Sequence, residues 1–257
     1  MPKLSLIIPS IRPENWVSLV ADMKYSCQSY DYEIIFVGPY LPPKELETDT
    51  QIRYVRDFGC PSRALQIGAS LAEGKYLAWC SDDCRIEPNG FDSAIELFDA
   101  ELDNDDGMCL LYSEGADYTG TQHEQPEYWI ARTHGDLKIP GVKEGWRIAP
   151  IFMYDRAYFV GLGGLDCSYE HVNMNTHDLA FQVQQKGGRI FTSPKRVFRF
   201  DWQPEKKDYM PILSSFIVND RPKFNQQYSH EDAAALRTVQ FDNWRQAQAI
   251  WGRRFKT

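Results

Sequence analysis

The sequence contains no long apolar run. No stretch approaches the ~20 consecutive apolar residues of a membrane-spanning helix, and the first ten residues lack the apolar core of a secretory signal peptide. A basic stripe is also missing: the formal net charge is −8, made up of −12 in residues 1–120 and +4 in residues 121–257. We therefore expect no transmembrane segment and no nucleic-acid partner.

The six cysteines do not have the spacing of a disulfide framework. A chain of 257 residues buries a sizeable core without cross-links, so we expect reduced thiols and a cytoplasmic location. Cys80 and Cys84 form a C-x3-C pair, but no second cysteine or histidine pair completes a zinc site. We interpret both as small side chains that contribute to packing.

Internal repeats, low-complexity tracts and clear linkers are absent as well. Hydrophobic residues make up 43% of the chain and aromatic residues 14%, which is typical of a globular protein and not of a disordered one. We therefore predict a single domain over residues 1–257.

The sequence does contain an alternation of short apolar runs with segments of helical periodicity. Five runs predict buried strands: LSLIIPS, YEIIFVGP, QIRYV, KYLAWC and GMCLLY. Helices are predicted over residues 13–28, 61–74 and 88–102, and over 176–188 with Thr176 as the N-cap. This order predicts an α/β fold in which helices cover both faces of a mostly parallel central sheet.

Polar or turn-forming residues cluster where the predicted strands end. Three of these ends carry Pro9-Ser10, Gly38-Pro39 and Ser81-Asp82-Asp83. Ligands of parallel sheets bind beyond the carboxyl ends of the strands, and a bound cation would relieve the repulsion between adjacent carboxylates. We interpret Asp82 and Asp83 as part of a site; the alternative is an acidic turn that caps the following helix.

The chain contains, in this order, LSLIIPSIRP, YEIIFVGP, DFGCPSRALQIGASLAEGKYLAWCSDDC, GGLD and HDLAFQVQQKGGRI. Over roughly residues 4–200 this set resembles the family 2 glycosyltransferases of the GT-A fold. The resemblance implies inverting transfer of a sugar from a nucleoside-diphosphate sugar to the hydroxyl of a glycan or another acceptor. Within the single domain we expect a nucleotide-sugar-binding half (about 4–115) and an acceptor-binding half (about 116–230). The helical pattern of the tail predicts a C-terminal helix (about 231–257).

The resemblance assigns the acidic residues to a metal site. Asp83 stands at the position of the family's metal ligand, and Asp82 at a contact to the ribose or to a metal-bound water. Asp201 is expected as a second ligand, its alternative being an ordinary carboxylate at a strand end. The chemistry agrees, because Mn²⁺ or Mg²⁺ takes oxygen ligands and neutralises the charge that grows on a departing diphosphate.

The resemblance also assigns a base and the contacts to the donor. Asp178, expected near a helix start, inherits the role of catalytic base; the alternative is a carboxylate that interacts with the helix dipole. Pro9, Ser10 and Arg12 form the expected nucleoside-contacting loop, and Arg63 is expected to reach the diphosphate or the base. For both arginines the alternative is a surface salt bridge.

Several positions depart from the family pattern. The acidic residue that usually follows the second strand is replaced by Gly38-Pro39, which leaves the nucleobase open. Ser81 replaces the first Asp of the usual D-x-D, Gln66 replaces an Asn, and His177-Asp178 replaces a Glu-Asp pair. These departures keep a second hypothesis open, a catalytically degenerate protein that only binds a sugar nucleotide.

Two further alternatives concern the reaction and the partners. A nucleotidyltransferase would normally have a Gly-rich phosphate loop after its first strand, and IIPSIRPEN contains no glycine. The tail from about residue 231 is interpreted as a helix packed on the domain, with peripheral membrane contact as the alternative. Aromatic faces stack well on sugar rings, and the aromatic residues considered for the acceptor are Tyr128, Trp129, Trp146, Tyr169 and His171.

Overall fold

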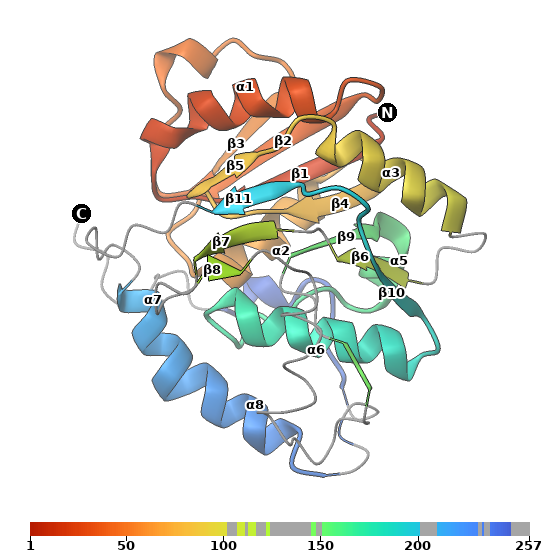
Figure 1. The fold of residues 1–257 in the computed structure, drawn as a ribbon. Helices are drawn as coiled ribbons and strands as arrows, with labels where there is room; N and C mark the ends of the chain where they lie inside the picture. The colour runs from red at the N-terminus through yellow and green to blue at the C-terminus, as the bar shows by residue number, and fades with distance from the viewer. Residues whose placement is uncertain are drawn as a thin grey trace.

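The computed structural model describes residues 1–101, 107–110, 113–116, 122–123, 145–147, 151–200, 210–230, 233 and 237–247. Its centre is a seven-stranded sheet in the order β10-β6-β9-β4-β1-β2-β3 (Figure 1). All neighbouring pairs are parallel except those of β9, which is antiparallel to both β4 and β6. The strands are β1 (Leu4–Pro9), β2 (Tyr32–Gly38), β3 (Ile52–Arg56), β4 (Tyr76–Trp79), β6 (Gly107–Leu110), β9 (Phe152–Asp155) and β10 (Arg189–Thr192).

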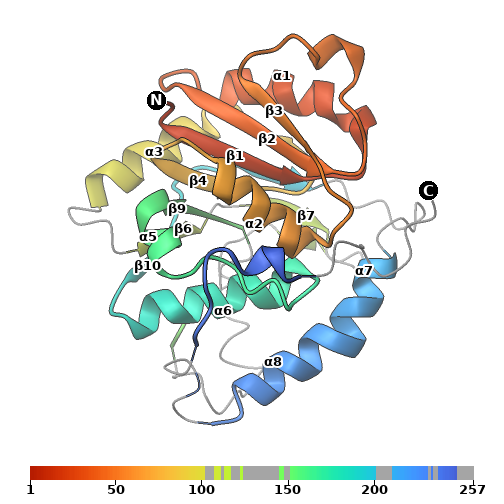
Figure 2. The same cartoon turned by 180° about the vertical axis from the view of Figure 1, so that it is seen from behind.

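Helices cover both faces of this sheet. Figure 2 shows α2 (Pro61–Leu71) crossing β1 and β2 on one face, while α1 (Trp16–Ser26) lies on the other face and contacts α3 (Gly90–Glu101). The long α6 (Val172–Gln185) packs against α2, β6 and β10. The prediction of an α/β fold with a mostly parallel, covered sheet is confirmed.

The remaining elements are short. A second sheet has the order β5-β11-β7-β8. Its strands are β5 (Cys84–Ile86), β7 (Ser113–Ala116), β8 (Gln122–His123) and β11 (Phe198–Phe200). The other helices are η1 (Pro13–Asn15), η2 (Lys44–Leu46), α5 (Arg156–Gly161), α7 (Met210–Ser215), the π-helical η4 (Phe216–Asp220), α8 (Arg221–Gln227) and η6 (Asn243–Arg245).

Burial explains why the central strands form. Every residue of β2 is buried, and β1 is buried up to Ile8, as expected for strands covered on both faces. The ring of Trp16 on α1 stacks on Phe36 of β2 at a centroid distance of 4.4 Å.

Within the described residues, no helix has the length and apolar composition needed to cross a membrane.

The predicted start of α6 at Thr176 is wrong. The helix begins at Val172, and the Nδ1 atom of its N-cap His171 accepts a hydrogen bond from the backbone N–H of Asn173 at 3.1 Å. A histidine ring here takes the place of the usual Ser, Thr, Asp or Asn cap. Asp178 consequently lies in the second turn of the helix and not at its start.

The predicted C-terminal helix is not present in the described part of the tail. Residues 237–240 have no helical structure, and η6 is a single 3-10 turn. The reason is tertiary: Gln66 Nε2 donates to the Phe241 carbonyl at 2.7 Å, and Arg63 Nη1 donates to the carbonyls of Trp244 and Ala247. These bonds hold the segment against α2, where an α-helix would use the same carbonyls internally.

Gln66 is the central residue of this attachment. Its side chain is fully buried, and its Oε1 atom accepts the backbone N–H of Leu165 at 2.8 Å while Nε2 reaches Phe241. One amide on α2 therefore fixes both the GGLD loop and the C-terminal segment.

We predict that Gln66→Leu lowers the free energy of unfolding by about 2–3 kcal/mol, because it leaves a buried N–H and a carbonyl without partners. Chemical denaturation of the purified variant measures this change. Ser70→Ala on the same helix is the matched control, since Ser70 is exposed and its hydroxyl bonds, among the described residues, only to the Ile67 carbonyl. Equal stabilities of the two variants would contradict the role given to Gln66.

Candidate functional site

A cavity of about 240 Å³ lies at the carboxyl ends of β1, β2 and β4. The structure brings together here all three strand ends singled out in the sequence. Five predicted site residues line it: Pro9, Ser10, Arg12, Asp82 and Asp83. The other lining residues are Ile11, Val37, Gly38, Pro39, Gly59, Pro61, Ala64, Trp79, Ser81, His171, Val172 and Ile212.

Asp82 organises the loop after β1. Its Oδ2 atom accepts hydrogen bonds from the Ser10 hydroxyl and from the backbone N–H groups of Ile11 and Arg12, all at 2.7 Å. Its Oδ1 atom lies 2.5 Å from Arg12 Nη1, and the residue is only 2% exposed. This carboxylate shapes the cavity wall and does not cap a helix; its predicted contact to a ribose stays a prediction.

Asp83 differs from its neighbour because its side chain is 22% exposed and its oxygens have fewer partners. Oδ1 accepts a hydrogen bond from Ser81, and Oδ2 is 3.9 Å from Arg12 Nη1. Burial raises the pKa of Asp83, Arg12 partly offsets this effect, and Asp82 adds to it. A further cation near Asp83 would stabilise its ionised form.

The residues present fit a metal ion that is coordinated mainly by water and by the substrate, with few ligands from the protein. No group of three His, Cys, Asp or Glu side chains suited to a metal occurs in the described part of the chain. Mg²⁺-type ions, however, are commonly bound by one or two carboxylates together with waters and substrate phosphates. Asp83 can supply one such carboxylate, while Asp201 lies outside the described residues.

Gly38 explains one departure from the family pattern. A β-carbon at this position would overlap the carbonyl oxygen of Ser10, so only glycine lets the loop after β1 lie against the end of β2. The acidic side chain expected after the second strand has no room at Gly38. Apolar side chains such as Val37, Trp79 and Ala64 line the cavity instead.

Two helices begin at the cavity. Pro61 at the start of α2 and His171 with Val172 at the start of α6 all line it. The positive ends of two helix dipoles therefore face the same space, which favours an anionic ligand group.

Arg63, predicted to contact the donor, does not line the cavity. Its Nη2 atom lies 3.0 Å from Asp57 Oδ1, and its guanidinium stacks on the Trp244 ring at 5.4 Å. In the structure Arg63 joins α2 to the C-terminal segment, and its role in donor binding stays a prediction.

Asp178, predicted to be the catalytic base, does not line the cavity either. It is fully buried; Arg237 Nε lies 2.6 Å from its Oδ2 atom, and Oδ1 accepts hydrogen bonds from Tyr228 at 2.5 Å and Gln227 at 3.1 Å. Burial raises the pKa of Asp178, while Arg237 and Tyr228 oppose that shift. The contacts join α6 to α8 and to the C-terminal segment, and the catalytic role stays a prediction.

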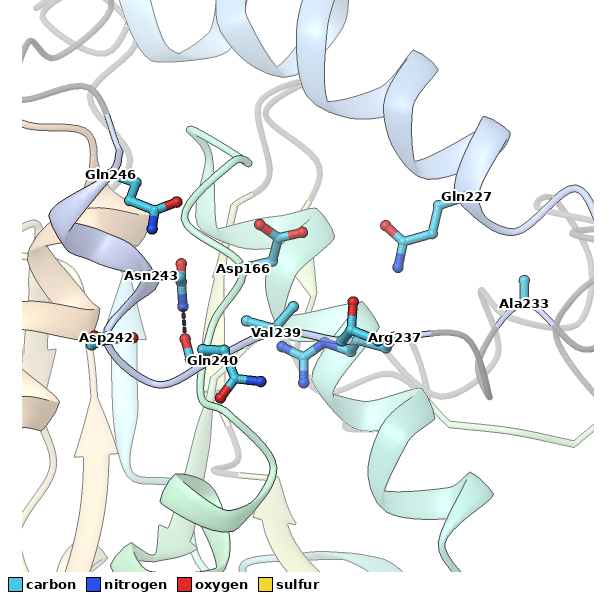
Figure 3. A pocket seen from close by; sticks show the side chains of 10 residues that line it. Asp166, Gln227, Ala233, Arg237, Val239, Gln240, Asp242, Asn243 and Gln246 are labelled. Atoms are coloured by element: carbon cyan, nitrogen blue, oxygen red, sulfur yellow. Dashed lines mark hydrogen bonds between the residues drawn. The ribbon is translucent and has the colours of Figure 1, made fainter.

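A second cavity, of about 560 Å³, lies between α8, the loop that contains Asp166 and the C-terminal segment (Figure 3). Its described walls carry the carboxylates of Asp166 and Asp242 and several amides. Arg237 is the one cation among those described walls, and it already faces Asp178. This second cavity offers little to a strongly anionic group.

Three cavity residues were not predictable from the sequence as residues of a donor site. Ile212 comes from a segment for which no element was predicted, and Trp79 reads as part of the strand core. His171 was considered only for the acceptor. Of the other aromatic candidates, Tyr169 is fully buried and donates to Gln227, Trp146 packs 5.8 Å from the Phe181 ring, and residues 128–129 lie outside the described part.

No family model and no curated protein matches this sequence. Solved structures do match. TarS of S. aureus aligns with a TM-score of 0.58 and 14% identity over 90% of this chain and 42% of TarS, so the chain spans less than half of that protein. TarS 1–349 in complex with UDP gives 0.55, 15% identity, and coverage of 90% and 70%.

GalNAc-T7 with UDP, GalNAc and Mn²⁺ aligns with a TM-score of 0.55 and 14% identity, over 96% of this chain and 53% of that one. Both proteins are glycosyltransferases of the GT-A fold. At such low identity the likeness is one of fold, and it confirms the GT-A fold predicted for this chain.

Proposed function

We propose that the protein is a glycosyltransferase that moves a sugar from a nucleoside-diphosphate sugar to an acceptor hydroxyl, with inversion at the sugar. The observation that carries the proposal is the cavity at the carboxyl ends of β1, β2 and β4. It combines apolar walls with Arg12, Asp83 and two helix N-termini. A flat base, a ribose and a diphosphate need this combination of surfaces.

The charges that line the second cavity also support assigning the donor to the first cavity. Its walls carry two carboxylates, and the one cation among the described walls is already paired. A diphosphate would meet repulsion there, so the donor is assigned to the first cavity. The acceptor, a glycan or another hydroxyl compound, stays a prediction, as do the cytoplasmic location and peripheral membrane contact.

A divalent cation, Mn²⁺ or Mg²⁺, belongs to the proposal. Asp83 would hold it, and the bound ion would neutralise charge on the departing diphosphate. The structure of GalNAc-T7 that matches in fold contains Mn²⁺. Arg12 adds a fixed positive charge beside the same carboxylate.

The inverting reaction also needs a base for the acceptor hydroxyl. The family resemblance assigns this role to Asp178, but Arg237, Tyr228 and Gln227 occupy its carboxylate. This enclosure favours one alternative, a protein that binds the sugar nucleotide without transferring the sugar. Turnover of a bound donor separates the two.

We predict that at least one of UDP, GDP, CDP and dTDP raises the melting temperature more strongly with Mn²⁺ or Mg²⁺ than without, because only the folded protein binds the pair. Asp83→Asn should remove the metal-dependent part of the shift. Asp99→Asn is the control, since Asp99 lies on α3, pairs with Lys3 and does not line the cavity. A full metal response in Asp83→Asn would overturn the assignment of Asp83.

We predict that Asp178→Asn lowers the free energy of unfolding by about 3 kcal/mol, because it leaves the buried guanidinium of Arg237 without a counter-charge. The double variant Asp178→Asn with Arg237→Met should recover part of this loss. Sugar transfer by the folded fraction of Asp178→Asn tests the assignment of Asp178 as the catalytic base. Loss of turnover while the variant still binds the donor supports that assignment. Full stability of the single variant would contradict the structural role.

A further inference from the structure

His171 occupies a defined place at the cavity wall. It is the N-cap of α6, a helix of 14 residues, and its Nδ1 atom accepts the Asn173 backbone N–H at 3.1 Å. The ring also packs against Phe216 at a centroid distance of 5.2 Å. Two independent contacts therefore fix the orientation of the imidazole.

The hydrogen bond to Nδ1 determines the tautomer. Because Nδ1 accepts, a neutral imidazole carries its hydrogen on Nε2. Burial lowers the pKa of His171 to about 4, so the ring is neutral near pH 7. Nε2 has no hydrogen-bond partner among the described residues, while the residue itself lines the cavity. The ring thus presents a neutral N–H donor on its side away from the helix.

The backbone behind His171 is also held in place. The fully buried carboxylate of Asp220 accepts the backbone N–H of His171 at 2.6 Å and that of Glu170 at 3.0 Å. Asp220 and Phe216 are the two ends of the π-helical turn η4. Such turns are rare and frequently occur at functional sites. Here the turn supports both the ring and the backbone of one cavity residue.

These constraints favour one kind of ligand group. A neutral N–H at the positive end of a long helix suits an anionic oxygen acceptor. The same atom cannot take a proton from a hydroxyl while it holds its own hydrogen, so this tautomer does not serve as a base. The charged groups of the described cavity wall are Arg12, Asp82 and Asp83, while His171 is neutral.

We propose that His171 Nε2–H donates a hydrogen bond to an oxygen of the donor's diphosphate, an inference that rests on the proposed function. As the bond between the sugar's anomeric carbon and the diphosphate oxygen breaks, its electron pair stays on that oxygen. The acceptor oxygen bonds to the same carbon, and the acceptor's proton leaves to a base. His171 keeps its own proton throughout and stabilises the oxygen that gains charge.

Two variants separate the donor from the helix cap. His171→Asn keeps a good N-cap acceptor but is too short to place a donor at the Nε2 position. His171→Gln supplies an amide N–H at nearly the original reach. His230→Asn is the control, because His230 is exposed and does not line the cavity. The probes are inorganic pyrophosphate and the four nucleoside diphosphates, titrated calorimetrically with Mn²⁺ present.

We expect His171→Asn to weaken binding of pyrophosphate and of the preferred nucleoside diphosphate by roughly 10-fold, as for a lost hydrogen bond to a charged group. His171→Gln should recover much of the affinity, and His230→Asn should bind like the wild type. Melting temperatures of ligand-free His171→Asn and His230→Asn should stay close to that of the wild type, because Asn keeps the cap of α6.

Unchanged diphosphate affinity in His171→Asn would overturn the inference while leaving the proposed function intact. Pyrophosphate binding that depends on His171, without binding of any nucleoside diphosphate, would support the inference and count against the proposed function. Failure of the wild-type protein to bind any of these probes would overturn both.

Discussion

The cavity depends on one buried carboxylate. Asp82 is almost completely removed from solvent, and a charge in that position is stable only when hydrogen bonds and an opposite charge replace its water. The loop after β1 supplies them through Ser10, two backbone N–H groups and Arg12. The need to compensate one charge therefore fixes the shape of a loop that lies 70 to 72 residues earlier in the chain.

This arrangement explains why the strand ends in two acidic residues. Asp82 and Asp83 are neighbours in sequence but do different things: the first is saturated inside the protein, and the second keeps part of its carboxylate accessible to the cavity. Arg12 lies next to both and reduces their mutual repulsion. A bound cation is thus not needed to make the pair tolerable in the folded protein, and the proposed binding of a cation by Asp83 rests on its partly exposed carboxylate.

The sequence predicted the local features and missed those set by distant contacts. Apolar periodicity located strands β1 to β4 and helices α1 to α3, but not the short β5 and η2. The rule on strand ends located Ser10 and Asp83 at one cavity, and the family resemblance added Arg12. The start of α6 was missed because a histidine serves as its cap. The prediction of a helical tail was wrong because Gln66 and Arg63 donate hydrogen bonds to backbone carbonyls of this segment. Likewise, nothing near Asp178 in the sequence indicates that Arg237 will pair with it.

Gly38 links the fold to the proposed recognition of a nucleotide donor. Because a side chain there would collide with Ser10, the protein cannot carry the acidic nucleobase contact typical of the family at this position. The collision arises from the same loop that Asp82 holds in place, so the two features constrain each other. Under the proposed function, recognition of a base would come from apolar packing against residues such as Val37 and Trp79 and from backbone groups around the cavity. Apolar packing alone discriminates poorly between bases of similar size, so selectivity would fall mainly on the backbone hydrogen bonds.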